Sequence, residues 1–453
     1  MRVLGGLKYG ASLLAIAGAM VAATTQAQAG GFAVREQSAY FQGMSFAGSA
    51  AGDALSSMFW NSAAAAAAPG INSETHVALV VPRSEITATG GALVDPLGFD
   101  TESGDIGDPT LVPASYANYQ LNERLFLGMA INGQYGFTTK PDNPDFAGTP
   151  IASTSKIFSI NFNPTVAYKF TPELTIGVGA QIIYADLRLS SNNDVPVDVT
   201  GDNVPDIVTT GRTTEADDWG FGATAGVIWQ PSAGTTFGLG YRSRIELEGE
   251  GSCRGRGLSN LAAAQQGGNL NGCLTGANVT ADLTLPDLVT ASFKQRVTER
   301  LAVLGTVEWQ NWSAMGAQAE FRNDAGQVVD VFPLDYDDGW FVSLGAEYAY
   351  SPDTTLRAGI GYEWSPINDD NRNVSLPDND RVWLSVGLST KLTERASIDL
   401  AYTHLFVKDS PINVPGGPTG TLLTAEAEGD IDIVAASFKY KWGASEPELE
   451  PLK

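Results

Sequence analysis

Histidine, the usual general base of hydrolytic enzymes, is almost missing from this chain. Only His76 and His404 occur, and no serine lies in a Gly-x-Ser-x-Gly context. An enzyme acting on lipids would need a nucleophile with a histidine base beside it, so we expect no enzyme. Gly220, Gly222 and Gly226 lack the spacing of a nucleotide-binding loop, and no helix follows them. The sequence therefore predicts no bound cofactor and no metal centre.

Basic residues and long hydrophobic runs are also scarce. The chain has 27 Lys and Arg against 51 Asp and Glu, which gives a formal net charge of −24 at pH 7. This balance excludes nucleic acid and anionic membrane surfaces as partners. Downstream of the N-terminal region, no window holds the roughly 18 unbroken apolar residues that a transmembrane helix needs.

Cysteine is scarce as well, and its position suggests a structural use. The two cysteines, Cys253 and Cys273, lie in a stretch rich in glycine, serine and asparagine. In an exported protein we expect them to form one disulfide that closes a surface loop, worth about 3 kcal/mol in the chain-entropy model. The alternative is a pair of free thiols.

Residues 1–29 have the three parts of a secretory signal peptide. Arg2 and Lys8 supply the positive start, residues 11–23 an apolar core and residues 27–29 (Ala-Gln-Ala) a small-residue cleavage site. An uncleaved membrane anchor is the alternative, but the apolar core is too short to span a bilayer. We therefore expect export through a cleaved signal.

Residues 30–70 show no period-two alternation and are rich in small side chains. They include Gly43, Gly48, Gly52 and the alanines of residues 63–68. Small residues let a segment fold compactly and let other backbone approach closely. We interpret this stretch as a plug, or hatch, inside a barrel that residues 71–442 build around it.

From residue 71 onward, long runs alternate between apolar and polar or small side chains. One face of each run is apolar, with aromatic residues at its ends, and the other carries small, polar and charged groups. This pattern is typical of strands with lipid on one side and a polar lumen on the other. The clearest runs begin at Leu174, Leu301, Trp340 and Leu356.

The connections between the runs alternate in kind. Seven long loops and six tight turns join fourteen strands, which predicts an all-β, 14-stranded antiparallel transmembrane β-barrel in the outer membrane of a Gram-negative bacterium. Trp442 ends the last strand, and we expect residues 443–453 to form an acidic periplasmic tail. The turns are expected at residues 122–124, 171–173, 230–235, 298–300, 351–353 and 393–395. The loops are expected at residues 95–109, 141–155, 190–213, 251–278, 322–335, 366–380 and 409–428.

Several stretches resemble the FadL family of outer-membrane transporters for hydrophobic compounds, which includes long-chain fatty acid and aromatic hydrocarbon channels. The most specific stretch is Leu-Pro-Asp-Asn-Asp-Arg-Val-Trp-Leu-Ser-Val-Gly at residues 376–387. Together the similar stretches span nearly the whole mature chain. The others are Gly31, Phe32, Glu36, Ser38, Gly43 and Gly48 in the hatch, residues 219–222 with Gly226, residues 241–243, residues 283–286 and residues 308–313.

The resemblance implies passive uptake of a hydrophobic small molecule. In this family the ligand enters a groove among the outer loops, passes to a pocket beside the hatch and leaves sideways into lipid through a kink in the third strand. On the hatch side, the resemblance places Phe32, Glu36 and Phe41 at the pocket.

The resemblance also places the lateral-opening kink in residues 131–137. Its residues would be Gly133, Tyr135, Gly136 and Phe137. Glycine inside a strand marks bulges and bends, which supports this position. The alternative is that the two glycines relieve crowding in the lumen.

The chain departs from the family where a ligand carboxylate would be met. Basic residues at the expected positions are not evident, and we expect Lys294, Arg357 and Arg381 to form ion pairs with lumen carboxylates. The hatch ends in Asn-Ser-Ala at residues 61–63, where the family has proline in the middle place. An apolar or aromatic ligand needs no cation, so these departures put fatty acid as the ligand in question.

Two other functions compete with a selective transporter: an open diffusion porin and a structural outer-membrane barrel. The hatch distinguishes them, because an open porin has no need of an N-terminal plug. We expect a monomer whose partners are the hydrophobic ligand, outer-membrane lipid and lipopolysaccharide. Asp369, Asp370 and the acids of residues 378–380 are expected to be solvated loop acids, with calcium binding as the alternative.

Overall fold

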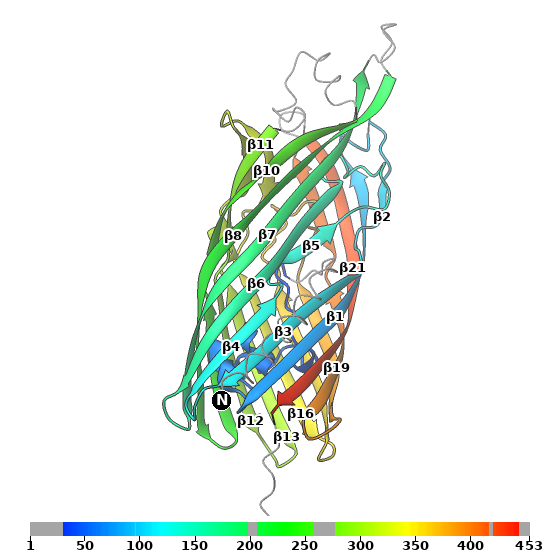
Figure 1. Ribbon diagram of the computed structural model, residues 1–453. Helices are drawn as coiled ribbons and strands as arrows, with labels where there is room; N and C mark the ends of the chain where they lie inside the picture. Colours follow the sequence, from blue (N-terminus) through cyan, green and yellow to red (C-terminus); the bar gives the residue numbers. More distant parts are fainter. Residues whose placement is uncertain (1–29, 96, 198–205, 258–276, 416–419, 444–453) are drawn as a thin grey trace, which may run out of the picture.

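The chain folds into a closed all-β barrel, shown in Figure 1. The computed structural model describes residues 30–95, 97–197, 206–257, 277–415 and 420–443. The predicted signal peptide and residues 444–453 of the predicted tail lie outside the described residues. Within the described part, no helix is long and apolar enough to cross a membrane.

Every neighbouring pair of barrel strands is antiparallel, and β1 closes the barrel against β21, from Ile71 opposite Trp442 to Gly90 opposite Thr424. Some barrel strands are interrupted, and their two parts carry separate labels. The strands are β1 Ile71–Gly90, β2 Glu102–Asp105, β3 Thr110–Gln120, β4 Leu125–Asn132, β5 Gly136–Thr139, β6 Thr154–Lys169, β7 Leu174–Val197, β8 Asp206–Ser232, β9 Thr235–Arg242, β10 Ile245–Gly257, β11 Ala277–Leu285, β12 Leu288–Arg296, β13 Leu301–Gln310, β14 Gln318–Asn323, β15 Val328–Pro333, β16 Gly339–Ala349, β17 Thr354–Trp364, β18 Arg381–Lys391, β19 Ala396–Val407, β20 Ser410–Pro415 and β21 Thr421–Trp442.

The predicted count of fourteen barrel strands is confirmed. Counted around the barrel they are β1, β3, β4 with β5, β6, β7, β8, β9 with β10, β11 with β12, β13 with β14, β15 with β16, β17, β18, β19 and β21. The short strands β2 and β20 pair with β1 and β21 beyond this wall. The six predicted turns are also confirmed: five lie between the end of one barrel strand and the start of the next, and the sixth, residues 230–235, contains the end of β8 and the start of β9.

Several predicted long loops are partly wrong, because strands run into them. β7 and β8 extend through parts of residues 190–213, β10 enters residues 251–278, β15 lies within residues 322–335, and β20 and β21 occupy most of residues 409–428. These parts of the strands were expected to be loops because the apolar side chains lie on the outer face in the lower part of a strand and on the inner face in its upper part.

β7 shows this reversal clearly. Below Tyr184, the exposed outer positions are apolar, such as Val178, and Gln181 is buried inside. Above Tyr184, Leu187 and Leu189 are buried inside, while Arg188 faces out and pairs with Glu215 of β8. The lower barrel is therefore apolar on its outer face, which lies in lipid. The upper barrel is apolar on its inner face, because its outer face is in contact with water.

Aromatic residues mark the two edges of the lipid-facing band. On β8, Trp219 and Trp229 are both about half exposed, and they pack against Tyr184 and Phe237 with ring centroids 5.4 Å and 5.7 Å apart. Ten residues at about 3.3 Å each, tilted by about 40°, span about 25 Å of membrane. This matches the height of the apolar band of outer-membrane barrels.

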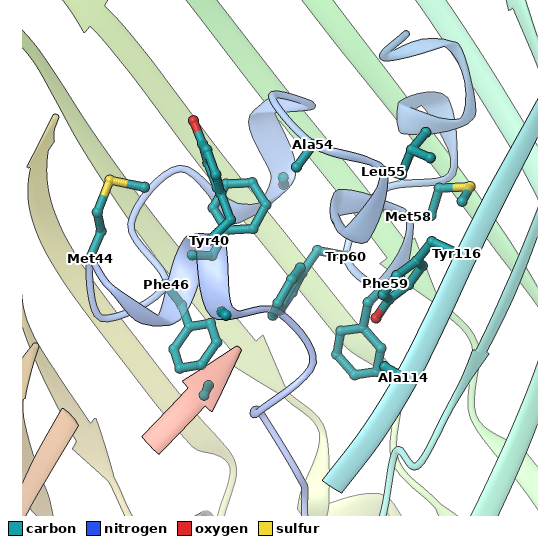
Figure 2. Packing of buried hydrophobic residues seen from close by; sticks show 14 of the residues in the cluster. Tyr40, Met44, Phe46, Ala54, Leu55, Met58, Phe59, Trp60, Ala114 and Tyr116 are labelled. Atoms are coloured by element: carbon teal, nitrogen blue, oxygen red, sulfur yellow. The ribbon is translucent and has the colours of Figure 1, made fainter. Parts of the chain in front are cut away.

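Residues 30–70, which we call the N-terminal segment, fold into short helices inside the lower barrel (Figure 1). They form α2 Ala39–Gln42 and the 3-10 helices η1 Ser49–Ala51, η2 Leu55–Phe59 and η3 Ser62–Ala66. Ser38 caps α2 and Asn61 caps η3, each through a side-chain oxygen. Figure 2 shows Phe59 and Trp60 of this segment packed near Tyr116 of β3.

Glycines of the wall allow the N-terminal segment to lie against it. A Cβ at Gly240 of β9 would overlap the carbonyl oxygen of Trp60, and one at Gly238 would overlap that of Ala50. On β17, a Cβ at Gly359 would overlap the backbone of Met44. The glycines of the alternating runs thus provide room for the backbone of the segment.

Gly240→Val should displace the N-terminal segment while the barrel stays closed. The added side chain must take the place of the Trp60 carbonyl, and overpacking of this kind costs about 1–3 kcal/mol or more. We expect residues 30–70 to become sensitive to protease in the purified protein, as mapped by mass spectrometry. Gly234→Ala is the matched control, because its Cβ meets nothing closer than 3.5 Å. Equal protection in both variants would contradict this packing.

Candidate functional site: an apolar chamber beside an interrupted strand

The upper barrel encloses a cluster of buried apolar side chains above the N-terminal segment, which we call the upper apolar cluster. The part of the barrel interior that these side chains occupy is called the apolar chamber. The cluster gathers the inward faces of the upper strands, together with Phe32 of the N-terminal segment. Because the reversal described above makes these faces apolar, the cluster is shielded from water by strands whose outer faces are charged. Its members include Phe32, Tyr135, Phe137, Ile183, Leu187, Leu189, Ile245, Leu247, Val279, Leu285, Trp312, Met315, Phe321, Val329, Phe332, Leu334 and Tyr336.

Phe32 is at the centre of an aromatic group at the floor of this cluster. Its ring centroid lies 4.7 Å from that of Trp312, 5.9 Å from that of Tyr135 and 6.1 Å from that of Phe137. Trp312 enters the barrel from a short 3-10 helix, η4 Trp312–Met315, which follows β13. Edge-to-face packing of this kind stabilises the group beyond its buried area.

The barrel strand made by β4 and β5 is interrupted at residues 133–135. β4 pairs with β3 and with β6, whereas in the described part of the chain β5 pairs with β6 alone. The upper part of β3, residues 110–114, pairs with β1 and has no ladder to β5 there. The wall therefore lacks its backbone ladder between β3 and β5.

The interruption is a β-bulge. Asn132 lies opposite Asn161 of β6, and Gly136 lies opposite Phe158, so three residues of one strand, 133–135, face two residues, 159–160, of the other. One extra residue bends a strand and ends its pairing on one side. The bulge also brings Phe137 to the inner face, where it joins the upper apolar cluster.

The backbone groups freed by the bulge are bound from inside the barrel. Gln134 O accepts from Val34 N at 2.9 Å, and Gly136 N donates to Phe32 O at 2.8 Å. The Ser159 hydroxyl accepts from Tyr135 N and donates to Tyr135 O, both at 2.8 Å. The N-terminal segment and Ser159 of β6 thus replace part of the missing ladder, and these four backbone groups of the bulge each have a partner.

A buried charge cluster lies beside Phe32. Arg35 forms ion pairs with Glu308 and with Glu363, the latter at 3.0 Å, and its guanidinium lies over the Phe341 ring. Arg381 pairs with Asp378, which is buried, so the expectation that Asp378 is a solvated loop acid is wrong. Bidentate or networked guanidinium pairs of this kind hold their partners in fixed positions.

Glu36 is the unmatched acid of this cluster. Its side chain is fully buried, and among the described residues neither carboxylate oxygen has a hydrogen-bond partner. Burial raises the pKa of Glu36 to about 7, because the charged form loses its hydration. Glu36 therefore gains a proton near neutral pH.

A second charge cluster lies lower in the barrel. Glu347 of β16 accepts from Lys294 at 2.6 Å and from Arg357 at 2.9 Å, and Lys294 also pairs with Asp53 at 3.1 Å. The expectation that Lys294, Arg357 and Arg381 form ion pairs with carboxylates is confirmed. These pairs join the wall to the N-terminal segment through Asp53.

The structure brings together most of the residues predicted for the site. Phe32, Tyr135 and Phe137 share the upper apolar cluster, and Glu36 lies beside the Arg35 cluster. Phe41 does not join them, because it belongs to a separate buried cluster lower in the barrel. There it packs against Trp60, and the two ring centroids are 5.8 Å apart. Reasoning from sequence missed Trp312, Phe332 and Tyr336, which line the same cluster as Phe32.

The predicted disulfide is only partly visible. Cys253 lies buried in β10, with its Sγ 3.3 Å from the Thr214 hydroxyl. Cys273 lies outside the described residues, so the bridge between the two stays a prediction.

The protonation state of Glu36 should make the stability of the N-terminal segment depend on pH. Its pKa in the folded protein lies above the ordinary value of 4.5, so the folded state binds the extra proton between about pH 4.5 and 7. Stability of the segment should fall as pH rises through this window, by up to roughly 3 kcal/mol. Hydrogen exchange of residues 30–41, corrected for the intrinsic rate, should show this loss in the natural protein and not in Glu36→Gln. Glu123→Gln, in an exposed turn, is the control, and parallel losses in all three proteins would refute the role of Glu36.

Comparison with known proteins agrees with this architecture. A FadL homologue from Pseudomonas aeruginosa has the same fold, with a TM-score of 0.80 at 22% identity, covering 91% of this chain and 100% of that one. The toluene transporter TbuX of Ralstonia pickettii superposes with a TM-score of 0.64 at 16% identity, covering 89% of this chain and 97% of its own.

Sequence comparison extends over the same length. The long-chain fatty acid transport protein of Escherichia coli O6:H1 is 26% identical over 463 aligned residues, covering 95% of this chain and 98% of its own. Outer membrane protein P1 of Haemophilus influenzae is 26% identical, covering 88% of this chain and 90% of its own. The model of the family described as "Outer membrane protein transport protein (OMPP1/FadL/TodX)" matches residues 20–442. The chain therefore belongs to the OMPP1/FadL/TodX family of outer membrane transport proteins.

Proposed function

We propose that this protein takes up small hydrophobic molecules by passive diffusion, and that they leave sideways through the barrel wall at the bulge of residues 133–135. The observation that carries this proposal is the continuity of apolar surface. The upper apolar cluster ends at Phe32, Tyr135 and Phe137, and the last two belong to the interrupted strand itself. On the outer face, Leu111 of β3 beside the break is 42% exposed, at the level of lipid.

The free energy of the ligand supports a lateral route. A ligand with about 300 Å² of apolar surface would lose about 7 kcal/mol on returning to periplasmic water, at about 25 cal/mol for each Å². A side opening into the membrane keeps that surface out of water throughout. We propose that the N-terminal segment acts as the hatch that closes the direct route below.

An open porin is disfavoured by the way the N-terminal segment fills the lower barrel. Asn118 Nδ2 of β3 donates to Ala65 O at 2.9 Å, and Gly48 N donates to the Thr306 hydroxyl of β13 at 2.9 Å. Contacts on opposite parts of the wall fix the segment across the lumen. Deletion of the segment would be needed to open a wide pore, whereas a structural barrel would need neither the segment nor the chamber.

The ligand itself is an apolar or aromatic compound, or a long-chain fatty acid. The aromatic floor of the chamber favours an uncharged ligand, because Lys294 and Arg357 are already matched by Glu347. A carboxylate head would meet donors that lack a hydrogen-bond partner among the described residues at Arg381 Nε and Nη1 and at Arg35 Nε. Two relatives carry these two ligand classes in their names, a fatty acid and toluene.

We further propose a monomer without catalytic activity that contacts membrane lipid and lipopolysaccharide directly. A single chain closes the barrel between β1 and β21, so no second copy is required. His76 accepts from Ala39 N at 2.9 Å, and its other ring nitrogen lies 3.0 Å from Glu36 O, which gives it a structural use. Above the lipid band, charged residues such as Arg83 and Arg188 face the level of the lipopolysaccharide head groups.

Deletion of Gly133 should abolish uptake by restoring the ladder. The bulge has one residue more than the facing strand, so removing one residue lets β4 and β5 continue in register. Uptake of a radiolabelled apolar compound by cells should fall by at least about tenfold, at equal surface expression. Deletion of Glu123, in an exposed turn, is the matched control and should leave uptake unchanged.

A hatch that is locked to the wall by a disulfide distinguishes the lateral route from a direct route through the lower lumen. Ser45→Cys with Ser385→Cys should form a disulfide between the N-terminal segment and β18, because the two hydroxyl oxygens are 2.8 Å apart. Uptake should persist after oxidation. If the oxidised pair stops uptake while the Gly133 deletion does not, the lateral route is wrong and the hatch itself moves.

A further inference from the structure

The hairpin of β14 and β15, residues 318–333, covers the upper apolar cluster from the outside. Its inward side chains are almost fully buried, and Phe332 stacks on Phe137 of the interrupted strand with ring centroids 6.3 Å apart. Its other face is exposed, for example at Gln318 and Arg322. The buried face consists of Ala319, Phe321, Val329 and Phe332.

The hairpin is weakly joined to the wall. β14 has three ladder pairs with β11, residues 279–281 opposite 321–323, and in the described part of the chain β15 pairs with β14 alone. A stable barrel wall has full ladders on both sides of each strand, so this part of the wall has much less backbone support.

The hairpin also has a narrow neck in which both chains leave regular strand geometry. Gly316 and Asp335 face each other across the neck, and both have a positive φ, of 80° and 57°. Asp335 N donates to Gly316 O at 3.0 Å, and this bond is the last of the hairpin before the 3-10 helix η4. Such a neck lets a hairpin pivot as a unit, because few backbone angles need to change.

Side chains of β8 hold the hairpin from across the chamber. Arg212 forms an ion pair with Asp330 of β15 and also donates to Val329 O at 2.7 Å. The Thr214 hydroxyl donates to the other carboxylate oxygen of Asp330 at 2.7 Å. β8 and β15 are not neighbours in the sheet, since β10, β11 and β14 lie between them, so these bonds join the hairpin to a strand with which it has no ladder.

We propose that the β14–β15 hairpin is the outer lid of the apolar chamber, with Arg212, Thr214 and Asp330 as its latch. The lid brings Phe321 and Phe332 onto the ligand and so helps to set which apolar shapes are accepted. Opening breaks the latch and tilts the hairpin at Gly316 and Asp335. Closure over a ligand restores the latch and excludes water from the chamber. The claim that a hydrophobic ligand passes the lid depends on the proposed function. The claim that the lid moves does not depend on it.

The latch is tested by Asp330→Asn and Thr214→Val in the full-length purified protein. Each change removes one charged or polar bond of the latch and keeps the shape of the side chain, and bonds to charged groups are among the stronger ones. We expect hydrogen exchange of residues 318–333 to rise at least about tenfold in Asp330→Asn, and less in Thr214→Val. The fluorescent apolar probe N-phenyl-1-naphthylamine should also bind faster. Glu320→Gln, on the exposed face of the same hairpin, is the control and should change neither rate.

A disulfide that can be reduced, placed between the hairpin and the wall, provides a second test of the lid. Thr280 of β11 and Arg322 of β14 are directly opposite each other on the outer face, so Thr280→Cys with Arg322→Cys should form a disulfide there. Oxidation should slow probe binding at least about tenfold, and reduction should restore it. Unchanged exchange in Asp330→Asn, or unchanged probe binding in the oxidised pair, would overturn the lid. Failure of the natural protein to bind any apolar probe, with the exchange results as expected, would instead count against the proposed function and leave the moving hairpin standing.

Discussion

The structure depends on one constraint: a strand in lipid must have its backbone hydrogen bonds satisfied within the protein. A wall made of barrel strands can therefore be interrupted only where other groups take over the ladder. In this protein the groups are Ser159 of the neighbouring strand and Phe32 and Val34 of the N-terminal segment. The N-terminal segment consequently has two roles, since it fills the lower lumen and also holds the edge of the break.

The apolar chamber results from the change of surroundings along the barrel, from lipid to water. Where the strands leave the membrane, their outer faces meet water and become charged, and the apolar side chains move to the inside. The chamber thus begins at the level where the lipid band ends. Because the bulge lies at this boundary, the apolar interior above and the apolar exterior below meet at Tyr135 and Phe137. The geometry explains how a hydrophobic molecule could change from one apolar environment to another without crossing water.

Much of the fold could be predicted from sequence, because the lower strands obey a simple alternation and their turns carry Pro, Asp, Asn and Glu. The upper strands could not, since the reversal at positions such as Tyr184 makes the same alternation look like a polar loop. Phe32 and the bulge were located through resemblance; composition alone offers no signal, because glycine is also common in strands without a break, such as β7, β8 and β17, and a bulge depends on the register of two strands. Trp312 and Phe332 were missed because they enter the chamber from irregular segments or an upper hairpin, where no periodicity marks the inward face. Phe41 and Phe32 belong to different buried clusters, and no pattern in the residues of the N-terminal segment distinguishes the two positions.

The central claim is that a hydrophobic ligand leaves through the wall beside residues 133–135. Photo-crosslinking tests it most directly: a diazirine-bearing alkane is allowed to pass through the natural protein in native outer membrane, the sample is illuminated during uptake, and the adducts are mapped by mass spectrometry. The account predicts adducts along one line, from Phe332 and Trp312 to Tyr135 and Phe137, and then on Leu111 of the outer face. Adducts on Leu55, Ala68 and Tyr440, which line the space below the N-terminal segment, with none on Leu111, would contradict it.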